Sequence, residues 1–179
     1  MQNGAYQKLM DNLCDIVAEE QAKLGYMKEP IRLYYPLSSL NHFFGGDVSA
    51  DEMQEKLSKF KSFAYDKFGE VEITHKGGRF CFFLSERATE YVHENGGQNQ
   101  FIFDLVALLA KHGTVMEEVE ALFAKQKDAY EIEKMNHGEF DYMIHFVDSK
   151  DKYLYCFKDE GCHIIYHRFL PEDYEDLGL

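Results

Sequence analysis

The sequence predicts an α+β protein built from two modules of similar design. Residues 63–67 (Phe-Ala-Tyr-Asp-Lys) resemble residues 123–127 (Phe-Ala-Lys-Gln-Lys), 60 positions further along the chain, and 78–80 resemble 138–140 at the same offset. In each copy the first segment is predicted to end a helix, and the second to open the return strand of a hairpin. Such an internal repeat constrains the architecture before any motif does. The repeated order is helix, Gly-capped turn, helix, strand, hairpin, strand. This is the order of a winged helix, so we expect tandem winged-helix-like modules.

The first module is expected to span residues 1–84. Its apolar residues recur at helical spacing up to Leu24, and Gly25 suits the position after the helix. Ser49 and Glu52 form a capping box at the start of another helix. The expected elements are a helix to Leu24, a strand at 31–35, a short helix from Pro36 to Phe44, a helix from 50 to 68, and a hairpin of strands 71–75 and 79–84.

The second module is expected at residues 85–179, with an antiparallel β-meander as a C-terminal extension and a solvated acidic tail at 171–176. Ser85 is predicted to cap its first helix, and Thr114 with Glu117 to form a second capping box. The expected elements are helices at 86–95, 100–111 and 115–127 and strands at about 130–135, 139–147, 152–158 and 161–168.

Composition restricts the class of protein. The chain has 179 residues, of which 45% are hydrophobic, and a formal net charge of −13. It contains no apolar run of the ~18 residues that a membrane helix needs, and its first residues do not form a signal peptide. The four cysteines lack the dense spacing of a disulfide scaffold, so we expect a cytoplasmic protein. No catalytic or cofactor motif occurs, and we expect no cofactor. The acidic charge disfavours nucleic acid and favours a protein partner.

One hypothesis is DNA binding by the helix at 50–67 and the hairpin at 75–79. A winged helix presents the outer face of such a helix to the major groove and the hairpin tip to the phosphate backbone. The outer face mixes both signs of charge, as a solvated helix does, and the stem of Lys56 is expected to lie along the core edge. The basic residues that would carry this hypothesis are Lys56, Lys59, His75, Lys76 and Arg79.

A second hypothesis is protein binding, either to a partner or to a second copy of the chain. The helix at 100–111 is apolar on nearly every side, which is typical of a core helix or of a dimer interface. The residues expected at this core or dimer helix include Phe101, Leu105 and Leu108. Tyr34 and Tyr35 are expected to be exposed aromatic contacts.

A third hypothesis is a metal site or a Cys–His dyad on the C-terminal sheet. If two-residue turns join its last three strands, Cys156 lies opposite His163, and His145 lies diagonally to Cys156. Cysteine and histidine in this arrangement could share a zinc ion or form a nucleophile–base pair. Alternation assigns the opposite face to the core, with Tyr142, Ile144, Phe146, Tyr153, Tyr155, Phe157, Ile164 and Tyr166. Ordinary half-exposed sheet residues explain the same pattern, so we assign no metal ligand and no catalytic residue.

Several segments resemble an uncharacterised family of gut clostridia. The resemblance rests on residues 19–26, 31–40, 155–157 and 163–169, the last of which reads His-Ile-Ile-Tyr-His-Arg-Phe. The resemblance implies a soluble bacterial protein and supplies no site residue. We therefore expect a cytoplasmic, non-enzymatic interaction or regulatory module that binds a protein partner. The alternatives are a DNA-binding transcriptional regulator and a small metal-dependent or Cys–His enzyme.

Overall fold

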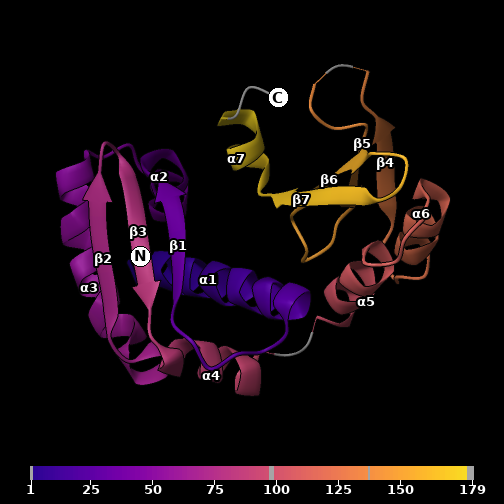
Figure 1. Cartoon of the computed structure of the whole chain (residues 1–179). Coiled ribbons are helices and arrows are strands. Elements are labelled where there is room, and N and C mark those ends of the chain that lie inside the picture. Colours follow the sequence, from indigo (N-terminus) through magenta and orange to yellow (C-terminus); the bar gives the residue numbers. More distant parts are fainter. Residues whose placement is uncertain (1, 97–98, 137, 177–179) are drawn as a thin grey trace. The chain divides into compact units, whose positions relative to one another are not determined.

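The structure is a computed structural model that describes residues 2–96, 99–136 and 138–176. Over these residues it is an α+β fold, as predicted, with seven helices and two antiparallel sheets (Figure 1). The helices are α1 (Gln2–Leu24), α2 (Leu37–Phe44), α3 (Ala50–Phe68), α4 (Glu86–Asn95), α5 (Gln100–Leu109), α6 (Met116–Ala124) and α7 (Pro171–Asp176). The strands are β1 (Ile31–Pro36), β2 (Val71–Lys76), β3 (Arg79–Leu84), β4 (Tyr130–Lys134), β5 (Tyr142–Phe146), β6 (Leu154–Asp159) and β7 (Ile164–Phe169). The chain divides into two compact units, 1–99 and 100–179.

The first unit packs its helices against a three-stranded sheet of order β1-β3-β2. The apolar stripes of α1 and α3 and one face of the sheet form a single core, because the sequence repeats apolar residues at helical and strand spacing. Strand β3 lies in the middle of the sheet, so β2 is an edge strand. The most deeply buried side chains of this core include Leu9, Leu13, Leu57, Phe60, Phe68, Phe80 and Phe82.

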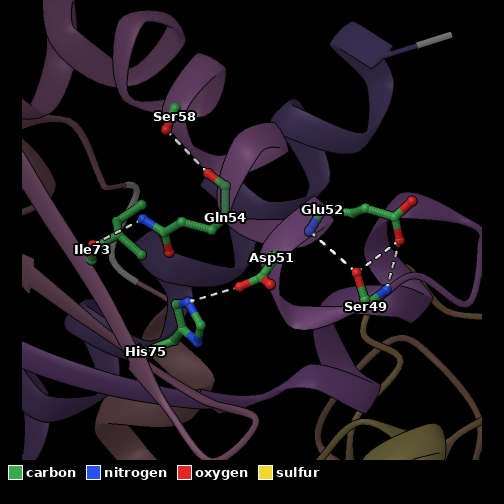
Figure 2. A network of polar contacts seen from close by, with 7 residues as sticks. All are labelled: Ser49, Asp51, Glu52, Gln54, Ser58, Ile73 and His75. Atoms are coloured by element: carbon green, nitrogen blue, oxygen red, sulfur yellow. Dashed lines mark hydrogen bonds and ion pairs between the residues drawn. The ribbon is translucent and has the colours of Figure 1, made fainter.

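Two local signals fix the position of α3 and of the hairpin. The Ser49 hydroxyl accepts a hydrogen bond from the Glu52 N–H at 3.4 Å, and the Glu52 carboxylate accepts one from the Ser49 N–H at 2.9 Å (Figure 2). The predicted capping box is therefore confirmed. Gly77 and Gly78 have φ values of +58° and +76°, which a two-residue hairpin turn of this kind requires.

Helix α4 belongs to the first unit. The Gln21 side-chain amide donates to the Thr89 carbonyl at 2.9 Å, and the Thr89 hydroxyl donates to the Glu29 carbonyl at 3.1 Å. The module boundary expected after residue 84 lies before α4, whereas the two compact units meet after residue 99. Ser85 occupies the predicted N-cap position, but its hydroxyl donates to the Phe68 carbonyl at 2.9 Å instead of capping α4.

The second unit packs α5 and α6 on one face of a sheet of order β4-β5-β6-β7. The ring of Phe123 in α6 lies within 6.3 Å, centroid to centroid, of five other rings of this unit, those of Phe101, Tyr130, Phe146, Tyr155 and Phe157. Ile144, Tyr155, Phe157 and Ile164 are buried. Four of the eight residues predicted for the core face are therefore buried. The other four, Tyr142, Phe146, Tyr153 and Tyr166, are half-buried, and Cys156 on the opposite face is also fully buried.

The register of the last two strands differs from the prediction. Strand β5 pairs with β6 as expected, with His145 opposite Leu154. Strands β6 and β7, however, are joined by four residues, 160–163, and Cys156 lies opposite His167 instead of His163. The longer loop shifts the pairing by an even number of residues. It therefore changes the partners and leaves the faces unchanged.

The second copy of the repeat begins and ends its elements differently from the first. Helix α6 ends at Ala124, so 125–127 follow the helix, whereas 63–67 lie within α3. Strand β5 starts at Tyr142, after the segment 138–140 that was expected to open it. The N-cap residue of α6 is Val115, whose N–H donates to the Glu118 carboxylate at 3.2 Å. The predicted Thr114–Glu117 capping box is wrong, because the Thr114 hydroxyl donates to the carbonyls of residues 108 and 111.

Two further expectations concern exposure. Glu172 and Glu175 of the acidic segment are exposed, as expected, whereas Tyr35 is not. The segment 171–176 forms α7, and the Tyr174 ring lies 6.0 Å from the ring of Phe169. This apolar contact holds the acidic segment against β7. Tyr34 is exposed as expected, but Tyr35 is only 5% exposed and donates a 2.6 Å hydrogen bond to the side-chain amide oxygen (Oδ1) of Asn12. Alternation along β1 places these neighbours on opposite faces of the sheet.

Candidate functional site

A groove of about 580 Å³ lies between the C-terminal half of α3 and the start of β2. The capping box sets where α3 begins, and Gly69 turns the chain directly into β2 with φ +69°. The ring of Tyr65, 52% exposed, forms part of one wall. The lining residues are Lys61, Ser62, Tyr65, Gly69, Glu70, Val71 and Glu72.

The other wall of the groove is the free edge of β2. The Gln54 side-chain amide donates to the Ile73 carbonyl at 3.2 Å (Figure 2). The main-chain groups of Ile73 therefore point away from β3. In an antiparallel ladder alternate residues share this orientation, so the N–H and C=O of Val71 and His75 point outward as well. Within the described part of the chain, Gln54 is the residue that hydrogen-bonds to this edge.

The basic residues of the DNA-binding hypothesis have different surroundings. The Lys56 ammonium lies 5.7 Å from the ring centroid of Phe44, and the Arg79 guanidinium lies 5.6 Å from that of Tyr34. The expected packing of the Lys56 stem along the core edge is therefore present. Lys59 on α3 and Lys76 on β2 are exposed.

His75 faces a carboxylate and an aromatic ring. Its imidazole stacks on the ring of Phe80, with centroids 5.0 Å apart, and its Nε2 lies 3.9 Å from a carboxylate oxygen of Asp51 (Figure 2). Asp51 stands in the first turn of α3, where the N-terminal end of the helix dipole favours a negative charge. A phosphate at His75 would therefore meet a carboxylate.

Of the metal or dyad hypothesis, His145 keeps its predicted position diagonal to Cys156, but His163 does not lie opposite Cys156. Cys156 is fully buried, and burial raises the pKa of its thiol to about 11. The Nε2 of His145 lies 3.5 Å from the Glu131 carboxylate. His163 lies in the β6–β7 loop, where its ring contacts Glu160 and Cys162. No group of three or more His, Cys, Asp or Glu side chains in residues 2–96, 99–136 and 138–176 is arranged to hold a metal ion.

The residues expected at the core or dimer helix lie on α5. Phe101 and Leu105 are buried, and Phe101 packs against Phe123 at 4.8 Å. Leu108 is half-buried. Two of the three residues are therefore core residues of the chain itself. None of the described helices has both the length and the hydropathy of a membrane-spanning segment.

The sequence hypotheses missed two features of these regions. The free edge of β2 follows from the strand order, which no local pattern encodes. The Cys162–His163 contact had a local signal, because the two residues are adjacent in the sequence and Glu160 and Gly161 precede them.

Comparisons with known proteins give one match. Residues 6–178 match a family model described as "Domain of unknown function, E. rectale Gene description (DUF3877)". The comparison with curated proteins and the comparison with solved structures each find no match. The resemblance to an uncharacterised clostridial family is thereby confirmed.

Proposed function

We propose a function on the premise that the chain belongs to the DUF3877 family, which is described as a domain of unknown function. The protein is a non-enzymatic interaction module that binds a partner protein in the groove between α3 and β2. The observation that carries this proposal is the groove itself, which has an unpaired strand edge on one side and an exposed tyrosine on the other.

The occupant that fits this groove is an extended, basic segment of a partner protein. An exposed strand edge accepts a further strand through main-chain hydrogen bonds, while pockets beside it select alternate side chains. The outward N–H and C=O of Val71 can form the main-chain hydrogen bonds with the added strand. The ring of Tyr65 offers an aromatic contact to one of its side chains. The exposed carboxylates of Glu70 and Glu72 and the net charge of −13 favour lysine or arginine in the segment.

We further propose that the first unit is a winged-helix-like module. Its element order, α1-β1-α2-α3-β2-β3, and its strand order, β1-β3-β2, support this assignment. In the second unit α5, α6, β4 and β5 follow one another in the order of α2, α3, β2 and β3, which supports a tandem arrangement. Fold resemblance alone supplies no function, so the groove remains the basis of the proposal.

A comparison of two matched tyrosine variants tests the proposed groove. Tyr65 lines the groove, whereas Tyr34, 56% exposed, lies on β1 at the other edge of the sheet. Tagged wild type, Tyr65→Asp and Tyr34→Asp are used to capture proteins from a native lysate, with and without nuclease. We expect a nuclease-resistant partner that Tyr34→Asp retains and Tyr65→Asp loses. Retention of every captured protein by Tyr65→Asp would contradict the proposal.

The nuclease arm also tests the DNA-binding alternative. The exposed Lys59 and Lys76, together with the element order of the first unit, support that alternative. It requires nuclease-sensitive capture and a mobility shift on duplex DNA that weakens steeply with salt. A Lys59→Glu, Lys76→Glu double variant should then lose the shift. Nuclease-resistant capture that this double variant retains would exclude phosphate contacts as the source of binding.

A further inference from the structure

In the loop that joins β6 to β7, a thiol contacts an imidazole, and the imidazole contacts a carboxylate. The Cys162 Sγ lies 3.1 Å from Nδ1 of His163, and Nε2 of the same ring lies 3.3 Å from a carboxylate oxygen of Glu160. All three residues are exposed. The order thiol, imidazole, carboxylate is the order of nucleophile, general base and orienting group in cysteine chemistry.

The two ring nitrogens of His163 have different partners, and this assigns their protons. A carboxylate accepts hydrogen bonds, so Nε2 carries the proton and donates to Glu160. Nδ1 of the neutral ring then holds a lone pair directed at the sulfur, and the thiol donates to it. His163 is therefore placed to take the proton of Cys162, and Glu160 stabilises the imidazolium that results.

Backbone hydrogen bonds fix the loop that carries these side chains. The Glu160 N–H donates to the His163 carbonyl at 3.0 Å, and the Gly161 N–H donates to the Asp159 carboxylate at 2.8 Å. The Gly113 N–H donates to the Cys162 carbonyl at 3.1 Å, which ties the loop to the segment before α6. Gly161 has φ +82°, a conformation that favours glycine. Thiol and imidazole are thus held together by the fold.

The other three cysteines have no such environment. Burial raises the pKa of both the Cys14 and the Cys156 thiols to about 11, and Cys81 is half-buried on β3. A raised pKa lowers the thiolate fraction at neutral pH and with it the reactivity. These three thiols therefore serve as internal controls for the reactivity of Cys162.

We propose that Cys162 is a reactive thiol that exchanges with small, low-molecular-weight disulfides, with His163 as its general base and Glu160 as the residue that orients the ring. The Cys162 proton moves from Sγ to Nδ1, and the thiolate attacks one sulfur of the disulfide. The S–S bond of the small molecule breaks as the new S–S bond forms, and the departing thiolate takes the proton from the imidazolium. The products are a mixed disulfide at Cys162 and one small thiol, so electrons and protons balance.

The test follows glutathione disulfide exchange on the reduced, full-length protein by peptide mass spectrometry at each cysteine. At pH 7 we expect Cys162 to be modified first. His163→Ala should slow this modification by about tenfold or more, and Glu160→Gln by less. At about pH 10, where thiols ionise without a base, the difference between wild type and His163→Ala should fall to about twofold or less.

His145 provides a matched control, because it also pairs with a carboxylate of the same sheet, Glu131, and lies on β5 away from the loop. His145→Ala should leave the Cys162 rate unchanged. If His163→Ala alters the circular dichroism spectrum, His163→Gln replaces it and keeps a polar side chain at the position. An equal Cys162 rate in wild type and the folded His163 variant at pH 7 would mean that exposure alone sets the reactivity, and would overturn the proposal. So would modification of Cys81 before Cys162.

Discussion

The side-chain amide of Gln54 donates a hydrogen bond to the main-chain carbonyl of Ile73, 3.2 Å away, and so links α3 to the free edge of β2 (Figure 2). Gln54 and Ile73 are 19 residues apart in the sequence, and they meet because α3 packs alongside β2 in the first unit. This contact occupies one acceptor of the edge and leaves the groove next to Val71 open. The stretch of β2 edge that is open to a partner strand is therefore limited by Gln54 at Ile73.

Replacement of Gln54 should weaken the first unit and expose more of this edge. Gln54→Ala removes a partly buried hydrogen bond, so we expect the free energy of unfolding to fall by about 1 kcal/mol. Urea denaturation measures this change. Ser58→Ala is a suitable comparison, because the Ser58 hydroxyl donates to the Gln54 carbonyl at an exposed site of the same helix. Equal stability of wild type and Gln54→Ala would show that water replaces the bond without cost.

The pKa of the Cys156 thiol predicts a loss of stability at high pH. Burial raises this pKa from 9.0 to about 11, so the folded protein holds the proton more tightly than the unfolded chain does. The corresponding stability is present in full below pH 9 and is lost as the pH rises through 11. Cys156→Ala should therefore lose less stability between pH 9 and 11 than wild type. Parallel urea denaturation curves at several pH values measure the difference, and identical pH dependences would contradict the prediction.

Helix α7 should protect Cys156 from reagents. Tyr174 packs its ring near Phe169, burial raises the pKa of its hydroxyl, and the Cys156 thiol contributes to that rise. Removal of this ring in Tyr174→Ala should increase the rate at which iodoacetamide labels Cys156 in the native protein. Tyr153→Ala would be a poor control because Tyr153 packs against Arg168 on the same sheet. Tyr34→Ala, in the first unit, should leave the Cys156 rate unchanged.

The core position of Leu105 predicts a large effect on stability. Leu105 is fully buried and Leu108 is half-buried. Leu105→Ala should lower the free energy of unfolding by about 2–5 kcal/mol, as large-to-small core substitutions do, and Leu108→Ala should lower it by less. Chemical denaturation of both variants measures this order. A smaller loss for Leu105→Ala than for Leu108→Ala would contradict it.

A homodimer through α5 remains a prediction that a charge at Leu105 cannot test, because a charge in the core would unfold the second unit. Leu108→Glu is the better variant, since this side chain is half-buried. Sedimentation at several concentrations should show a mass that rises with concentration for wild type and not for Leu108→Glu. A constant monomer mass for wild type would leave α5 as a core helix.

The sequence by itself determined the elements and their faces. Apolar spacing placed the helices and strands, the Ser49–Glu52 pair fixed the start of α3, and alternation identified the core face of the second sheet. These features depend on neighbours in the chain, so a local pattern is sufficient to encode them. The β5–β6 register matches the prediction, although residues 147–153 join the two strands in place of the assumed two-residue turn.

Only the tertiary structure decided which residues of different elements meet. The four-residue β6–β7 loop placed Cys156 opposite His167 and left His163 beside Cys162, because each strand register depends on the length of its connection. The strand order made β2 an edge, and the contact between the rings of Tyr174 and Phe169 holds the acidic segment against β7. Contacts of this kind are set by the free energy of packing the whole unit, to which many distant residues contribute, and a local stretch of sequence does not contain them.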